Sequence, residues 1–343
     1  MRIVVFGAGG FVGGWICEEL YQRNDIEVVA CVRKWASAVR LARRGVDIRR
    51  IDLEEANELP AILNGADVVV NAAMLPPLRE PKLVAALYFA CVRASVRRFI
   101  QFSSAVIYGN QTGDVDENMA PTPVDDYSRG KAEMESGLAE AAARSDTQLF
   151  ILRPSIIYGP FSETWTVRYA ERIIKGRWRG LGRVGVGTCN LVHAHDVAKA
   201  VIAAATADIA PGVHMLNING PDEVSWNEYI ERLGDALGTP DRVTPNVMLL
   251  RAMAVAAGIM RMGAKFAWLR SFYRRSAGIT RDAMMNASVV TRLYPSSVEL
   301  NLLSRKVHYS AKQAARVLGL SPSIRLEEGL RQSVAWCRMH GVT

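Results

Sequence analysis

The sequence predicts an α/β fold, in which a doubly wound parallel sheet is followed by a smaller, mixed C-terminal domain. Two observations lead to this prediction. Across residues 3–103, short apolar runs rich in Val and Ile alternate with helix-like stretches. After Pro160 the alternation gives way to helical stretches joined by Gly- and Pro-rich connectors. Regular strand–helix alternation is typical of parallel sheets that helices cover on both faces.

The strands are expected at the short apolar runs, because strands buried on both faces are nearly continuous in Val, Ile and Leu. These runs cover residues 3–6, 27–32, 46–51, 67–71, 98–103 and 148–153. Helices are expected between them at residues 11–22, 81–94 and 125–144. Later helices are expected at residues 164–175, 196–206, 225–237 and 326–339.

Length and composition restrict the class of protein. The chain has 343 residues, of which 50% are hydrophobic and 22% charged, and this excludes a disordered chain and suits two domains. No apolar run reaches about 18 residues without a charge, which argues against a transmembrane helix. The N-terminus lacks a signal-peptide pattern. The 5 cysteines are scattered, so we expect no disulfide, no metal site and a cytoplasmic location.

The net charge of +8 is concentrated in one segment. Between Arg242 and Arg281 the chain has eight basic and no acidic residues, which equals the whole excess. Nucleic-acid binders spread or stripe their basic residues more widely, so we expect no nucleic-acid partner. Within the segment, the Met-rich residues 248–270 have three interpretations: a weak contact with an anionic membrane surface, a cap over a hydrophobic substrate pocket, or ordinary domain core.

A glycine motif follows the first expected strand and opens the first expected helix. It reads Gly7-Ala8-Gly9-Gly10-Phe11-Val12-Gly13. In this context the backbone turns tightly and a pyrophosphate can approach the helix N-terminus, where free N–H groups favour anions. The motif predicts dinucleotide binding by its glycines and first helical residues, namely Gly7, Gly10, Phe11, Val12 and Gly13.

Residues that follow the next strands are expected near the same dinucleotide. Arg33 follows the second strand, where NAD-selective folds present an acid to the ribose 2′-hydroxyl. An arginine there suits a 2′-phosphate, so NADP is preferred over NAD; the alternative is an ordinary exposed loop arginine. Asp52 and Leu53 follow the third strand and are expected near the adenine. Ala72 and Ala73 follow the fourth strand and bring small residues close to the cofactor.

Tyr127 and Lys131 lie four residues apart on an expected helix, so they project from one face. A phenol has a reference pKa of about 10, and a neighbouring ammonium favours the phenolate. Alone, this pair is usual on a solvated helix face. Together with Ser104, which follows the fifth strand at the edge where ligands of such folds bind, it predicts a catalytic site.

These motifs resemble those of the extended short-chain dehydrogenase/reductases, the NAD-dependent epimerase/dehydratase family, whose nucleotide-binding part is a Rossmann-type sheet. Later landmarks of the family are matched by residues 152–160, 191–198 and 309–336. The resemblance covers nearly the whole chain and weakens between about residues 240 and 300.

The resemblance implies a role for each matched residue. Tyr127 becomes the general acid/base, and Lys131 lowers its pKa and holds the nicotinamide ribose. Ser104 hydrogen-bonds the reacting oxygen, and Pro154 lines the nicotinamide pocket. Family members often dimerise through two helices, which here would be residues 81–94 and 125–144, so we expect a homodimer.

The resemblance and the connectors together give the expected domains. Residues 1–160, with a return segment at 189–218, form the dinucleotide-binding domain. Residues 161–188 and 219–343 form the substrate-binding domain.

Two departures from the family pattern restrict the reaction. Sugar dehydratases place Asp-Glu directly after the catalytic hydroxyl residue, whereas Ser104 is followed by Ala105 and Val106, so the acid and base of a dehydration are missing. Nucleotide-sugar members often place an arginine where this chain has Cys189. That change puts the diphosphate contact in doubt unless arginines of the basic segment replace it; Cys189 itself is expected to be a small packing residue.

The leading hypothesis is an NADP- or NAD-dependent enzyme acting on a small molecule, a nucleotide sugar, by ketone reduction or C4 epimerisation. Arg33 favours the reductase, because epimerases of the family mostly retain NAD. The alternative substrate is a hydrophobic ketone or aldehyde, as in steroid-dehydrogenase-like relatives. A third interpretation is a cofactor-binding protein without catalysis.

Overall fold

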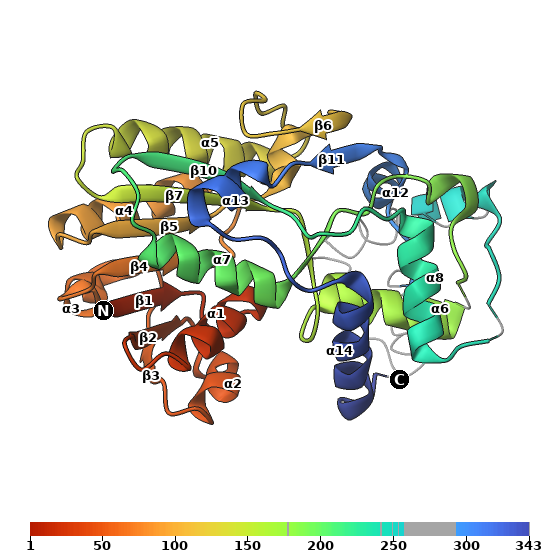
Figure 1. The fold of residues 1–343 in the computed structure, drawn as a ribbon, viewed down its shortest axis with the longest axis horizontal. Coiled ribbons are helices and arrows are strands. Elements are labelled where there is room, and N and C mark those ends of the chain that lie inside the picture. The colour runs from red at the N-terminus through yellow and green to blue at the C-terminus, as the bar shows by residue number, and fades with distance from the viewer. Residues whose placement is uncertain (177, 241, 249, 253, 257–292, 343) are drawn as a thin grey trace, which may run out of the picture. The chain divides into compact units, whose positions relative to one another are not determined.

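The computed structural model confirms the predicted fold (Figure 1). It describes residues 1–343 except 177, 241, 249, 253, 257–292 and 343, so most of the basic segment and of the Met-rich stretch lies outside the described residues. The centre is a seven-stranded sheet in the order β10-β7-β5-β4-β1-β2-β3, and all its neighbouring strands run parallel. Its strands are β1 Arg2–Phe6, β2 Glu27–Val32, β3 Asp47–Arg50, β4 Val68–Asn71, β5 Arg98–Phe102, β7 Gln148–Pro154 and β10 Val213–Ile218.

Helices cover both faces of the sheet (Figure 1). On one face lie α1 Phe11–Tyr21, α7 Ala194–Thr206 and α13 Lys312–Leu318; on the other lie α3 Leu59–Leu63, α4 Glu80–Arg93 and α5 Asp126–Ala142. The short α2, Val39–Ala42, contacts α1. Successive valines of a strand point to opposite faces of the sheet. Val5 and Val70 pack in the core with α1 and α7, whereas Val4 and Val69 pack in the core with α4. Burial on both faces explains why these strands are unbroken apolar runs.

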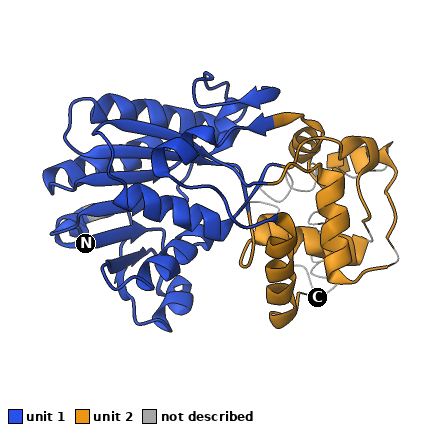
Figure 2. Cartoon of the chain, viewed as in Figure 1, with its two compact units in different colours: residues 1–157, 190–221, 308–325 blue, residues 158–189, 222–307, 326–343 orange. Residues whose placement is uncertain are grey.

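The structure divides into two compact units (Figure 2). Unit 1 contains residues 1–157, 190–221 and 308–325; unit 2 contains the other described residues. Residues 308–325 thus differ from the expectation, which assigned them to the substrate-binding domain. Hydrogen bonds fix them in unit 1: the buried Asp196 carboxylate accepts the backbone N–H groups of Ser323 (3.1 Å) and Ile324 (3.0 Å). The Asn219 side chain also donates to the Tyr309 carbonyl (3.0 Å).

Two small pairs of strands belong to the segments that leave the main sheet. They are β6 Gly113–Val115 with β11 Val307–Tyr309, and β8 Ile156–Tyr158 with β9 Leu191–His193. At three residues each, these strands are too short to show a periodic pattern in the sequence, and none was predicted.

Unit 2 packs its helices around aromatic residues and one buried ion pair. The helices are α6 Arg168–Gly176, α8 Trp226–Leu237, α12 Ser297–Ser304 and α14 Leu326–Met339. Arg172 is buried, donates to both oxygens of Glu299, and has its guanidinium over the Tyr169 ring. Trp226 stacks on Tyr169 from α8. Among the helices described in either unit, none is both long and apolar enough to cross a membrane.

Candidate active site at the carboxyl edge of the sheet

The glycine turn after β1 is held by close backbone contacts. Gly7 has a φ of +75°, which favours glycine, and a Cβ atom there would lie 2.5 Å from the Ala73 nitrogen. Gly7 also accepts the Gly10 N–H at 2.9 Å. The turn therefore lies directly against the segment that follows β4, where Ala72 and Ala73 leave room for it. In doubly wound sheets, ligands bind at this edge, where the strand order reverses between β1 and β4.

Helix α1 begins with its N-terminus open. Its cap residue is Gly10, which is exposed and offers no side chain to the first N–H groups of the helix, those of Phe11 and Val12. Such an end attracts anions through its N–H groups and its dipole. The backbone here fits the pyrophosphate of a dinucleotide, because a capping side chain would compete for the same N–H groups.

The side chains that follow β2 and β3 differ in their exposure to solvent and in their contacts. Arg33 and Lys34 are exposed directly after β2. The Asp52 carboxylate accepts the Glu54 N–H at 3.1 Å and so stabilises its own turn. Leu53 packs against the core on the α4 face. Of the three residues predicted here, Arg33 is thus the one that is exposed to solvent.

The segment after β4 is held by a buried amide pair. The Asn71 side chain donates to the Gln101 side chain at 2.8 Å, and the side-chain oxygen of Asn71 accepts the Ala73 N–H at 3.2 Å. Pro154 is buried at the end of β7 and pairs in register with Ile218 of β10. These contacts hold the ends of β4 and β7 in place at the carboxyl edge of the sheet.

Tyr127 and Lys131 are positioned by the start of helix α5. The Asp125 carboxylate accepts the Ser128 N–H at 2.7 Å, while the Ser128 hydroxyl accepts the Asp125 N–H at 3.0 Å, which forms a capping box. The box places Tyr127 in the first helical turn and Lys131 one turn later. The Lys131 Nζ lies 5.8 Å from the centre of the Tyr127 ring. The predicted pair therefore does share one face.

Ser104 joins this pair from the neighbouring strand. It follows β5 and caps the short helix η3, Ala105–Tyr108, by accepting the Val106 N–H at 3.3 Å. Its side chain also hydrogen-bonds Tyr127. A serine hydroxyl, a phenol and an ammonium group thus converge at the end of β5, all within unit 1. This arrangement can bind an oxygen atom and give it a proton.

One residue of this cluster was not predicted from the sequence. Glu80, the first residue of α4, accepts a hydrogen bond from Lys131 Nζ at 2.7 Å, and both side chains are buried. Lys131 also donates to the Phe102 carbonyl at 3.0 Å. A glutamate at a helix start is common, so nothing in the sequence distinguishes Glu80 from a surface residue.

Burial dominates the environment of Tyr127. Burial raises the pKa of Tyr127 to about 12, and the negative charges of Glu80 and Asp125 act in the same direction. The hydrogen bond with Ser104 partly opposes this rise in the pKa. The Lys131 ammonium, near the Tyr127 ring, is paired with the Glu80 carboxylate. The phenol is therefore protonated at neutral pH.

Cys189, in unit 2, is fully buried, and burial raises the pKa of its thiol well above the ordinary value. A buried thiol of this kind is suited to packing, as predicted, rather than to nucleophilic chemistry. All five cysteines are free and buried. Over the described ranges of the chain, no group of His, Cys, Asp or Glu side chains forms a candidate metal site.

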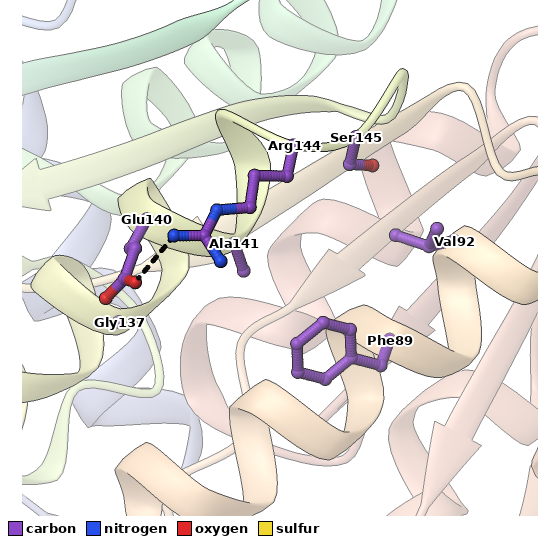
Figure 3. Close-up of a pocket in the computed structure, with 7 residues that line it drawn as sticks. All are labelled: Phe89, Val92, Gly137, Glu140, Ala141, Arg144 and Ser145. Carbon is purple, nitrogen blue, oxygen red and sulfur yellow. Dashed lines mark hydrogen bonds and ion pairs between the residues drawn. The ribbon is translucent and has the colours of Figure 1, made fainter.

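A pocket of about 360 Å³ lies between helices α4 and α5 and includes none of the predicted site residues (Figure 3). Phe89 and Val92 of α4 face it on one side, and the ion pair of Glu140 with Arg144 borders it on the other. Phe89 is 49% exposed. This pocket belongs to the outer surface of the two helices that were predicted to form a dimer contact.

Comparison with known proteins identifies relatives over most of the chain. The model of the NAD dependent epimerase/dehydratase family matches residues 3–218. The chain is 25% identical to the 2-alkyl-3-oxoalkanoate reductase of Stenotrophomonas maltophilia, over 97% of this chain and 98% of that protein. It is also 25% identical to the UDP-glucose 4-epimerase of Vibrio cholerae, over 69% of this chain and 76% of that protein.

Among solved structures, the fold is similar to that of a UDP-glucuronic acid 4-epimerase from Bacillus cereus in complex with NAD. The TM-score is 0.74 and the identity 18%, and the match covers 100% of this chain and 99% of that one. At this identity the likeness concerns the fold.

Proposed function

Because the chain belongs to the NAD dependent epimerase/dehydratase family, we propose that its Ser104–Tyr127–Lys131 cluster transfers a proton while hydride moves between NAD(P) and a carbinol or ketone carbon. The observation that carries this proposal is the convergence of the three side chains at the carboxyl end of β5. The matching test is a Tyr127→Phe variant, which should lose turnover and keep cofactor binding. A variant that keeps turnover would contradict the assignment, and an inactive wild-type protein that binds cofactor would favour the non-catalytic interpretation.

In the proposed reduction, Ser104 and Tyr127 hydrogen-bond the carbonyl oxygen of the substrate. A dinucleotide held at this edge would supply the hydride for the carbonyl carbon. Tyr127 then donates its proton to that oxygen, and Ser104 stabilises the developing negative charge. Lys131 would hold the nicotinamide ribose, and Pro154 would border the nicotinamide.

We propose that the open end of α1 and the glycines Gly7, Gly10 and Gly13 hold the pyrophosphate. Asp52, Leu53, Ala72 and Ala73 border the rest of the dinucleotide. Arg33 faces the 2′ position of the adenosine ribose, and its exposed guanidinium supports a preference for NADP. The test is titration of the purified protein with NADPH and NADH. Tightly retained NAD would contradict the preference and would favour an epimerase that recycles its cofactor.

We propose a nucleotide sugar as the substrate, and its ketone reduction or C4 epimerisation as the reaction. The relative from Vibrio cholerae that is named UDP-glucose 4-epimerase supports this substrate class. The alanine and valine that follow Ser104 argue against dehydration, which would need an acid and a base there. A panel of UDP- and dTDP-linked sugars and keto-sugars, assayed with each cofactor, tests the proposal.

A second substrate class, a hydrophobic ketone or aldehyde, is favoured by one observation. The position at which nucleotide-sugar members often carry an arginine is the buried Cys189, which offers no charge to a diphosphate. The reductase of Stenotrophomonas maltophilia, similar over 97% of this chain, supports this class. Turnover of long-chain ketones without turnover of any nucleotide sugar would establish it.

We further propose a homodimer through α4 and α5. The exposed Phe89 ring and the pocket between these helices support the proposal, since large exposed aromatic side chains are typical of interface cores (Figure 3). Sedimentation equilibrium of the wild type and of a Phe89→Glu variant tests it, because the charge should separate the two copies. A monomeric wild type would contradict it.

A further inference from the structure

A segment without polar side chains runs along the carboxyl edge of the sheet from the glycine turn to helix α5. This apolar segment comprises residues 72–78, Ala-Ala-Met-Leu-Pro-Pro-Leu. At its start, the Ala73 nitrogen lies 2.5 Å from the place where a Cβ atom of Gly7 would be. Near its end, the Pro77 carbonyl oxygen lies 2.5 Å from the place where a Cβ atom of Gly130 would be. Backbone contacts therefore fix the segment against both the turn and the helix.

The contact with α5 is made on the face that carries the proposed catalytic phenol. Gly130 lies three residues after Tyr127 and directly before Lys131. Residues three or four apart on a helix are neighbours on its surface, so Gly130 and Tyr127 share a face. A molecule that is bound at Tyr127 therefore has the apolar segment as its neighbour.

Two large side chains of the apolar segment are exposed although its backbone is fixed. Met74 is 79% exposed and Leu78 is 87% exposed. Between them, Leu75 packs against the core, and the Pro76 carbonyl accepts the Arg79 N–H at 2.9 Å. Apolar side chains gain free energy when a ligand covers them. The segment thus presents a ready apolar surface beside the catalytic cluster.

Cations near the apolar segment are already paired with carboxylates. One of them directly follows the segment, and two flank the glycine of α5 that the segment contacts. The pairs are Arg79 with Glu54, Arg129 with Asp126 and Lys131 with Glu80. A diphosphate is typically bound by cations and N–H groups, whereas an alkyl chain needs only apolar surface. These surroundings therefore suit an alkyl chain better than the diphosphate of a nucleotide sugar.

We propose that Met74 and Leu78 are specificity-determining residues, which bind the alkyl chain of an aliphatic ketone while its carbonyl group lies at Ser104 and Tyr127. This inference rests on the proposed function and selects the second of its two substrate classes. Each methylene group that the two side chains cover adds to the binding free energy, so affinity should increase with the length of the chain.

The test measures the binding of 2-alkanones to the full chain saturated with NADP⁺, because a ketone cannot accept hydride from the oxidised cofactor. Calorimetric titration gives Kd for 2-pentanone, 2-heptanone and 2-nonanone, and the titrations are repeated without cofactor. In the wild type each added methylene should tighten binding about two- to fourfold. UDP-glucose, added as a competitor, should not displace 2-nonanone.

Met74→Ser and Leu78→Ser remove most of an apolar side chain at exposed positions, so both variants should keep the fold. Each should weaken binding of 2-nonanone about five- to tenfold and that of 2-pentanone less. Met339→Ser is the matched control, because Met339 is also exposed, at 76%, but lies on α14 of unit 2. It should leave all three Kd values unchanged.

Equal affinity for the three ketones, wild-type Kd values in both Met74→Ser and Leu78→Ser, or an equal loss in Met339→Ser would overturn the proposal. Displacement of 2-nonanone by UDP-glucose would also overturn it. So would weaker NADPH binding in the two variants with no change in the dependence on chain length, since the segment would then serve the cofactor. Turnover with NADPH is measured separately. A protein that binds longer ketones more tightly but never reduces them would refute the proposed function and leave this inference standing.

Discussion

The carbonyl oxygen of Gly7 lies 2.2 Å from the place where a Cβ atom on Gly13 would have to be. Real Cβ atoms do not approach an oxygen this closely, so the helix and the turn before it can touch only through glycine. A Gly13→Ala variant should therefore lose about 1–3 kcal/mol of stability and should bind NADPH more weakly. Thermal unfolding and cofactor titration measure the two effects.

Gly137→Ala is the control for this substitution. Gly137 lies in α5, where an added Cβ atom meets nothing within 4 Å, so alanine should stabilise the helix by about 0.5–1 kcal/mol and leave cofactor binding unchanged. Wild-type affinity for NADPH in Gly13→Ala would show that the turn does not approach the cofactor.

Ser104 and Ser103 offer a matched pair of hydroxyl deletions. Ser104 hydrogen-bonds Tyr127, whereas the Ser103 hydroxyl is buried and has no hydrogen-bond partner among the described residues. Ser104→Ala should lower kcat about 10²–10³-fold, as removal of an oxyanion donor does, and Ser103→Ala should have little effect. The values are measured once a substrate is known. Similar losses in both variants would mean that the site needs Ser103 for packing and would leave Ser104 without a special role.

Arg33 is expected to set the cofactor preference. Reversing its charge in Arg33→Asp should weaken NADPH binding about 10–100-fold, the equivalent of one charge-assisted hydrogen bond, and should spare NADH. Fluorescence titration with both cofactors measures the ratio. Arg97→Asp is the charge-matched control, because Arg97 is exposed just before β5, at the opposite edge of the sheet. Equal weakening of both cofactors by Arg33→Asp would contradict the assignment.

The raised pKa of Tyr127 predicts a loss of stability in alkali. The pKa is about 12 in the folded protein and about 10 in an unfolded chain, so the neutral phenol stabilises the fold at pH values below 10. This contribution is lost as the pH rises from 10 to 12. The free energy of unfolding should therefore fall more steeply over that range in the wild type than in Tyr127→Phe.

Urea unfolding at several pH values measures this difference. The Tyr127→Phe comparison is needed because Tyr169 and Tyr229 are also buried, and burial raises their pKa values as well. Parallel slopes in the wild type and the variant would show that Tyr127 ionises in the folded protein as it does in water.

Asp196 is expected to secure the third piece of unit 1. Its carboxylate accepts three hydrogen bonds, from the N–H groups of Ser323 and Ile324 and from the Ser323 hydroxyl. Asp196→Ala removes the acceptor of the Ser323 and Ile324 N–H groups and should cost about 1–3 kcal/mol. Hydrogen exchange should then increase selectively at residues 308–325. Uniform exchange across the sheet would show that this segment does not unfold separately.

The strands of the sheet and several helices could be predicted from regular patterns in the sequence. Strands such as β1 and β4 are unbroken apolar runs, and the helix 326–339 was predicted with the bounds that the structure has. The Tyr127–Lys131 pairing follows from helical spacing alone. These features depend on neighbours within a few residues, which is why periodicity detects them.

The other features depend on contacts between distant segments. Glu80 and Lys131 are 51 residues apart, and Asp196 and Ser323 are 127 apart, so no local pattern joins either pair. The pKa of Tyr127 could not be predicted for the same reason. The helical spacing placed a cation beside the phenol, but only the fold brings in Glu80, the carboxylate that pairs with this cation.

The three-part composition of unit 1 also bears on the order in which the protein is made. Strand β10, at the edge of the sheet beside β7, begins only at Val213, and the segment that Asp196 holds ends at Arg325. During synthesis the sheet emerges first with the edge of β7 uncovered, and uncovered strand edges pair readily with other chains. The sheet can therefore be completed only once β10 has left the ribosome, and unit 1 only once residues 308–325 have followed, so a product truncated before β10 would keep an open edge.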